Sequence, residues 1–159
     1  MFSFRKKGQD FLISAPIGGK LIKLEEVNDE VFSSKMMGDG FAILPSSGIN
    51  LVVSPVDGEV VSLPDSKHAV GITTRDGIDV LVHVGIDTVA LKGQGFNSFV
   101  KAGQKVKRGS KLLSFDNDFM KNQGIDTTVM TIITGGYDKK IELSANYQSE
   151  VSAYDVLIS

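Results

Sequence analysis

The chain has 159 residues, a net charge of −2 and 42% hydrophobic residues, which fits one globular domain. It contains no cysteine, which excludes disulfides, thiolate zinc sites and cysteine nucleophiles. The slightly acidic balance argues against nucleic-acid binding, and no apolar run approaches the roughly 20 residues of a membrane-spanning helix. We therefore expect a single cytoplasmic domain over residues 1–159, without stable membrane insertion, whose residues 1–10 form a flexible N-terminal segment.

Short runs rich in β-branched residues, separated by glycine-containing turns, dominate the chain. Such runs predict strands, and helix is minor. In chain order we expect a helical turn over residues 28–35, strands over 41–44, 51–54, 58–63, 68–74, 78–84, 111–115 and 129–133, and a helical turn over 117–122. Many short strands with turn signals between them are typical of an all-β sandwich or barrel. The expected fold class is therefore all-β, an antiparallel β-sandwich with minor short helices.

The chain has two histidines, His68 and His83, on neighbouring predicted strands. Side chains of a strand alternate between its faces, so in the strand over residues 78–84 the valines lie in the core and His83 on the outer face. A turn centred on residues 75–76 makes the histidines direct cross-strand neighbours. A turn centred on residues 76–77 places them diagonally on one face, whereas a loop with an odd number of residues separates them.

Two adjacent neutral imidazoles can divide the work of phosphoryl transfer. One nitrogen can attack phosphorus while a ring N–H of the partner donates a hydrogen bond to the phosphoryl oxygens. Histidine suits this task because its pKa lies near 6.5, which leaves a neutral nucleophile at cytoplasmic pH. The same spacing also fits two ordinary surface histidines or a two-histidine zinc site. The spacing of the histidines leaves these three interpretations open.

The residues around the histidines carry a family resemblance. The run over residues 81–89, LVHVGIDTV, resembles the phosphorylation-site motif VHxGIDTV of glucose-type enzyme IIA domains of the bacterial sugar phosphotransferase system. Further blocks match that family in order and spacing, namely GDGFAI, PVDG, KHA, LKGQGF and GQKVKRG. The resemblance covers roughly residues 12–159 and is weaker after residue 117.

This resemblance implies an antiparallel β-sandwich of the duplicated hybrid type and a phosphotransferase activity whose only added group is a transient phosphohistidine. His83 would be phosphorylated at Nε2, and Gly85 would hold the Nδ1 proton with its carbonyl oxygen. His68 would steady the phosphoryl group. Ser66 stands where the family has threonine, so we expect it to orient His68 less firmly.

The resemblance also implies two partners. The phosphorylated histidine carrier protein (HPr) would donate the group, and the cysteine of enzyme IIB of a sugar transporter would receive it. The apolar docking patch would consist of Phe32, Met36, Met37, Leu81 and Val89, with Val82 matching the family but turned inward by alternation. The carboxylates Asp29 and Asp87 would attract a basic donor side chain. Regulatory proteins that read the phosphorylation state would use the same patch.

Two other functions fit the residues less well. Zinc peptidases of a similar fold need HxxxD and HxH motifs, but Ile72 and Gly85 stand at the missing ligand positions. Weak zinc binding by His68 and His83 alone remains as an alternative. A biotinyl or lipoyl carrier domain would be modified at Lys67, whose neighbours do not resemble the usual flanks of that lysine.

Overall fold

The computed structural model describes residues 11–48 and 50–159, so the predicted N-terminal segment over residues 1–10 lies outside the described part. The described chain is mostly strand, and its strands pair in antiparallel fashion. The strands are β1 (Ile13–Ser14), β2 (Gly19–Lys23), β3 (Asp39–Pro45), β4 (Leu51–Val53), β5 (Gly58–Ser62), β6 (Ala69–Thr73), β7 (Asp79–Val84), β8 (Phe96–Ser98), β9 (Lys105–Val106), β10 (Lys111–Phe115), β11 (Val129–Gly135), β12 (Glu150–Val151) and β13 (Val156–Ile158). The helical elements are η2 (Leu24–Glu26), α1 (Glu30–Ser33), η3 (Thr88–Leu91) and α2 (Asn117–Asn122). The prediction of an all-β antiparallel fold with minor helices is confirmed.

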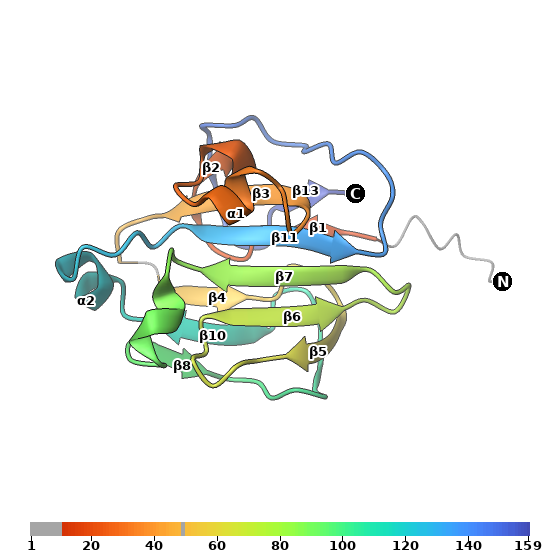
Figure 1. The fold of residues 1–159 in the computed structure, drawn as a ribbon. Helices are drawn as coiled ribbons and strands as arrows, with labels where there is room; N and C mark the ends of the chain where they lie inside the picture. The colour runs from red at the N-terminus through yellow and green to blue at the C-terminus, as the bar shows by residue number, and fades with distance from the viewer. Residues whose placement is uncertain (1–10, 49) are drawn as a thin grey trace, which may run out of the picture.

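Two sheets form the sandwich (Figure 1). The larger has the order β12-β2-β3-β11-β7-β6-β5-β9 and the smaller the order β4-β10-β8, while β1 pairs with β13. Val82 of β7 and Leu112 of β10 are fully buried in one cluster that draws on both sheets. The main core therefore lies between the sheets, and the inward valines of β7 belong to it.

A second, smaller core lies on the other face of the larger sheet; we call it the outer core. Its buried residues are Ile22, Leu24, Val27, Phe32, Ala42, Met130 and Ile132, with Leu81 and Ile86 packed partly buried against it. The sheet contributes residues from β2, β3 and β11, and the segment over residues 24–33, which holds η2 and α1, contributes the rest. Because the histidine face of β7 is this same face, the outer core decides the surroundings of His83.

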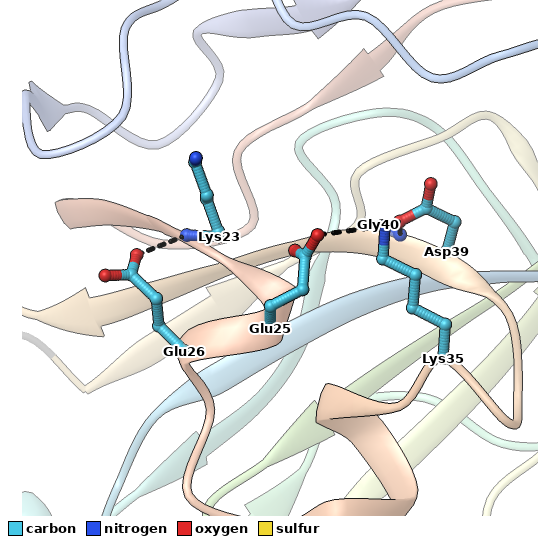
Figure 2. Close-up of polar contacts among 6 residues, drawn as sticks. All are labelled: Lys23, Glu25, Glu26, Lys35, Asp39 and Gly40. Carbon is cyan, nitrogen blue, oxygen red and sulfur yellow. Dashed lines mark hydrogen bonds and ion pairs between the residues drawn. The ribbon is translucent and has the colours of Figure 1, made fainter.

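Ion pairs tie the segment that follows α1 to its surroundings (Figure 2). The Nζ atom of Lys35 lies 3.2 Å from Glu25 Oε2 and 3.3 Å from Asp39 Oδ1. Asp39 Oδ1 also accepts a 2.8 Å hydrogen bond from the Gly40 N–H at the start of β3. Exposed pairs contribute at most about 1 kcal/mol each. The cluster therefore matters chiefly because it links η2, the end of α1 and β3.

No helix in residues 11–48 and 50–159 is long and apolar enough to cross a membrane. All seven predicted strands and both predicted helical turns are present, with ends that differ by a few residues. The prediction missed six strands, namely β1, β2, β8, β9, β12 and β13. Most of these are two or three residues long, too short for a periodic pattern to be seen.

Candidate active site

His83 lies on the outer face of β7, one residue before its end. Val82 and Val84, on either side of it, are fully buried, whereas His83 and Leu81 are half-buried. This alternation is as the sequence predicted. The half-burial of His83 arises because the outer core covers part of the same face.

The register of the hairpin that carries both histidines differs from the two registers that would place them on one face. Ala69 of β6, not His68, lies opposite His83. The loop between Thr74 and Ile78 has an odd number of residues, and it is closed by a 2.8 Å hydrogen bond from the Thr74 N–H to the Ile78 carbonyl. Of the three registers that the sequence left open, the structure has the one with an odd-numbered loop, for which strict alternation would send His68 to the opposite face.

The two imidazoles lie together all the same. Their ring centroids are 4.9 Å apart, and the ring planes meet edge to face at 82°. His68 precedes the first residue of β6, and Lys67 before it has a left-handed backbone with φ of 56°. The chain bends at His68, just before β6 begins, so strict alternation does not hold there and the rings lie together as expected.

Ser66 contacts the ring of His68. Its Oγ atom lies 2.6 Å from His68 Nδ1. When the hydroxyl donates to Nδ1, the neutral imidazole carries its proton on Nε2. That tautomer leaves an N–H donor on the ring nitrogen of His68 that Ser66 does not contact.

The two nitrogens of His83 differ in access. Nδ1 is buried and has no hydrogen-bond partner of standard geometry in the described part of the chain. A backbone hydrogen bond with Gly85 is nonetheless among the interactions that raise the pKa of His83, so the Gly85 backbone lies next to the ring. Because Nδ1 is buried, Nε2 is the nitrogen that can reach a reactant.

Burial keeps both rings neutral. It lowers the pKa of His83 from 6.5 to about 4, and the neighbouring His68 lowers it as well, while the Gly85 backbone and the Asp29 carboxylate act less strongly in the opposite direction. Burial also lowers the pKa of His68. At pH 7 His83 therefore has a free lone pair on one ring nitrogen, as a nucleophile needs.

The apolar residues predicted to form the docking patch do not share one environment. Three of them are exposed, at 75% for Met36, 57% for Val89 and 40% for Met37. Leu81 is half-buried, and Phe32 is only 6% exposed. The centroid of the Phe32 ring lies 4.8 Å from that of His83. Phe32 is therefore mostly buried in the outer core beside His83, because α1 turns it toward the sheet, and its part in docking stays a prediction.

The two predicted carboxylates also differ. Asp29 is the N-cap of α1 and accepts a 2.9 Å hydrogen bond from the N–H of Val31. It is half-buried, and its charge favours protonation of His83. Asp87 is exposed and has a left-handed backbone with φ of 59°. The Asp29 side chain therefore stabilises the start of α1 in addition to any role in docking. Asp87 stands at the N-cap of η3, but its side chain makes no capping hydrogen bond there.

The turn after β7 is anchored by residues that the sequence analysis did not select. Gly85 has a φ of 79°, and its N–H donates to the carbonyl of Thr128 at 2.7 Å. The Ile86 N–H donates to the carbonyl of Asp126 at 2.9 Å, and the hydroxyl of Thr88 donates to the carbonyl of Val84. Asp126 and Thr128 are more than 40 positions from His83, so no local motif could have pointed to them.

No group of three or more histidine, aspartate or glutamate side chains that could hold a metal ion occurs in the described ranges. The histidine pair supplies two ligands, fewer than a zinc site requires. The fold and the site together define the class of protein: an antiparallel β-sandwich in which two half-buried, neutral imidazoles pack edge to face.

Comparison with known proteins agrees with this class. Residues 11–138 match the family described as phosphoenolpyruvate-dependent sugar phosphotransferase system, EIIA 1, and the chain belongs to this family. The glucose-specific EIIA component of Bacillus cereus is 45% identical over 134 residues, which is 84% of this chain and 80% of the relative. The glucosamine-specific EIICBA component of Bacillus subtilis is 44% identical over 137 residues, which is 86% of this chain and 21% of that larger protein. Glucose permease IIA from Mycoplasma capricolum has the same fold, with a TM-score of 0.84 and 40% identity over 99% of this chain and 98% of that one.

Proposed function

We propose that the chain accepts a phosphoryl group on His83 from phosphorylated HPr and passes it to the cysteine of an enzyme IIB. The observation that supports this most is the pair of rings with centroids 4.9 Å apart, in which the Nδ1 atom of His83 is buried. Such a site leaves one nucleophilic nitrogen beside one ring N–H donor, and neither needs a metal or a base to become active.

In the first step the lone pair on Nε2 of neutral His83 attacks phosphorus in line with the bond to the donor's histidine. The new N–P bond forms as the old one breaks, and the donor's histidine keeps the electron pair of the broken bond. In the second step a thiolate of enzyme IIB attacks phosphorus, and His83 leaves as the neutral ring. Because both steps are simple displacements, the protein contributes chiefly positioning and stabilisation of charge.

His68 serves the phosphoryl oxygens in both steps. With Nδ1 held 2.6 Å from Ser66 Oγ, its Nε2–H can donate to an oxygen that carries negative charge. A donor placed where charge develops stabilises the transition state. The partners dock on a patch that includes the exposed side chains of Met36, Met37 and Val89, because methionine adapts to differently shaped surfaces.

Sugar uptake is the process that this carrier serves. The relatives in the comparison are named glucose-specific and glucosamine-specific, which supports a glucose-type sugar, and a carrier that takes phosphate from HPr would act in the cytoplasm. Regulatory partners would meet the same exposed residues, where phosphorylation of His83 adds nearly two negative charges. The decisive test is phosphoryl transfer in variants of the two histidines.

Replacing Ser66 with alanine is expected to slow donation about fivefold, because one hydrogen bond of about 1 kcal/mol that orients His68 is lost. Ser66→Thr keeps the hydroxyl and should donate within about twofold of the unmodified protein. The measurement is the rate at which phosphorylated protein loses its group to enzyme IIB. Equal rates for Ser66→Ala and Ser66→Thr would show that the 2.6 Å contact does not orient His68.

The depressed pKa of His83 predicts a loss of stability in acid. The unfolded chain takes up this proton near pH 6.5 and the folded chain near pH 4, so the contribution is complete above pH 6.5 and is lost as the pH falls toward 4. The loss attributable to His83 is up to about 3 kcal/mol. We expect the unfolding free energy of the unmodified protein to fall more steeply between pH 7 and 4 than that of His83→Gln. Parallel curves, or a ring titration of His83 by NMR above pH 6.5, would contradict the burial argument.

A further inference from the structure

The segment that leads into β11 is joined to the turn after His83 by two backbone hydrogen bonds. The Gly85 N–H donates to the Thr128 carbonyl at 2.7 Å, and the Ile86 N–H donates to the Asp126 carbonyl at 2.9 Å. We propose that Asp126 is a positioning residue for His83, because its side chain fixes the backbone that holds the peptide group next to the imidazole. This inference rests on the phosphocarrier function proposed above and deepens it.

The peptide group between Gly85 and Ile86 faces two neighbours. Its carbonyl belongs to Gly85 and its N–H to Ile86, and in a trans peptide these two groups point in opposite directions. No peptide bond in the described residues is cis. The N–H that points at Asp126 therefore directs the Gly85 carbonyl away from that segment.

The Gly85 carbonyl is the backbone group that acts on the imidazole. Burial lowers the pKa of His83, and a backbone hydrogen bond with Gly85 opposes this shift. An acceptor for the ring N–H has this effect, since it favours the protonated ring. The Gly85 N–H is already engaged by Thr128, which leaves the carbonyl as the acceptor for Nδ1, the buried ring nitrogen.

The side chain of Asp126 closes a ring over the two residues that follow it. Its Oδ1 atom accepts from the Thr128 N–H at 2.9 Å and from the Thr128 hydroxyl at 2.6 Å. A carboxylate that bonds to the N–H two residues further on fixes the backbone between the two residues, as in an Asx turn. The carbonyls of Asp126 and Thr128 belong to this stretch, so the turn sets the direction of both acceptors.

The two chain segments approach each other closely at this point. A Cβ atom at Gly85 would lie 3.1 Å from the Asp126 carbonyl oxygen. Thr128 is 2% exposed, and the residue after it begins β11, which pairs with β7. A shift of the Asp126–Thr128 turn would therefore move the Gly85 carbonyl relative to a histidine that the sheet holds in place.

The position of this carbonyl matters because it selects the tautomer of His83. An acceptor beside Nδ1 favours the neutral ring that carries its proton there and keeps the lone pair on Nε2. The other tautomer carries the proton on Nε2, which then has no lone pair with which to attack phosphorus. Loss of the Asp126 side chain should therefore lower the share of the reactive tautomer and leave the surface on which partners dock unchanged.

The test compares Asp126→Ala with Asp126→Asn. Alanine removes both bonds to Thr128, whereas the amide oxygen of asparagine can still accept them. Asp155→Ala is the matched control, since the Asp155 carboxylate accepts from the Ser152 N–H and its carbonyl accepts from the Ala15 N–H, both at 2.8 Å, beside the β1–β13 pair. Thr128→Val, which removes the hydroxyl alone, serves in place of Asp126→Ala should the alanine variant fold poorly.

Two quantities are measured on each variant. The first is the rate of phosphoryl transfer from phosphorylated HPr over a range of HPr concentrations. The second is the pair of ring ¹⁵N shifts of His83 in the unphosphorylated protein, which report the tautomer. For Asp126→Ala we expect kcat to fall about fivefold with KM within about twofold of the original, and the ¹⁵N shifts to move toward a mixture of tautomers.

Asp126→Asn and Asp155→Ala should change neither quantity. Unchanged kcat and ¹⁵N shifts in Asp126→Ala, or a rise in KM alone, would overturn the proposal. An asparagine variant as impaired as the alanine variant would also overturn it, because the charge and not the hydrogen bonds would then be responsible. If the unmodified protein accepts no phosphoryl group, the proposed function fails, whereas the ¹⁵N comparison still decides whether Asp126 positions the carbonyl beside the ring.

Discussion

His83→Ala is expected to accept no phosphoryl group, whereas His68→Gln is expected to accept it and to donate it slowly. Alanine removes the nitrogen that bonds to phosphorus, and the chain has just one other histidine, His68, which we propose to serve the phosphoryl oxygens instead. Glutamine keeps an N–H donor near the site but loses the ring geometry that His68 has against His83. Hydrogen bonds to charged oxygens contribute about 1.5–3 kcal/mol, so donation should fall roughly 10- to 100-fold.

The measurement is intact mass after incubation with phosphorylated HPr, followed by transfer to enzyme IIB. Arg75→Gln is the matched control, since Arg75 is exposed in the loop at the other end of the β6–β7 hairpin. It should accept and donate normally. Phosphorylation of His83→Ala by HPr would rule out His83 as the carrier residue, and normal donation by His68→Gln would rule out the proposed role of the second ring.

Gly85→Ala is expected to destabilise the protein and to impair acceptance of the phosphoryl group. Gly77→Ala should destabilise the protein only mildly and should leave acceptance unchanged. Both glycines have positive φ, 79° and 85°, so each alanine costs about 1–2 kcal/mol in backbone strain. A Cβ atom at Gly85 would lie 2.4 Å from the Cγ2 atom of Thr88, while one at Gly77 meets nothing within 4 Å. We expect about 2 kcal/mol of additional destabilisation at Gly85 from this overlap.

The effect on acceptance follows from what the turn anchors. Thr88 donates its hydroxyl to the carbonyl of Val84, the residue after His83, so a displaced Thr88 shifts the end of β7. The free energy of unfolding in denaturant and the rate of phosphoryl transfer are measured on both variants. Their comparison separates the backbone strain, which both variants share, from the overlap with Thr88, which only Gly85→Ala has. Equal losses of stability, or normal acceptance by Gly85→Ala, would mean that the turn absorbs the methyl group without moving His83.

Much of the fold, and the residues proposed for the site, could be predicted from local sequence patterns. The β-branched run over residues 78–84 predicted both the strand and its buried face, because alternation is a property of any extended chain. The motif around His83 indicates the family that residues 11–138 match. The short strands β12 and β13 could not be predicted in this way, because two or three residues acquire strand geometry only through their partners β2 and β1.

The sequence by itself determined which residues we propose for the chemistry: two histidines, a serine two positions before one of them, and a glycine two positions after the other. Only the tertiary structure decided how they meet. The β6–β7 loop has an odd number of residues, one of the possibilities that the sequence left open, and the two rings lie together although strict alternation would separate them. It was likewise the contact between α1 and the outer face of the sheet that buried Phe32 beside His83. Residue types and their spacing specify local conformation, but burial and ring contacts depend on chain segments that are distant in sequence, and these meet only when the sheets and the covering segment pack together.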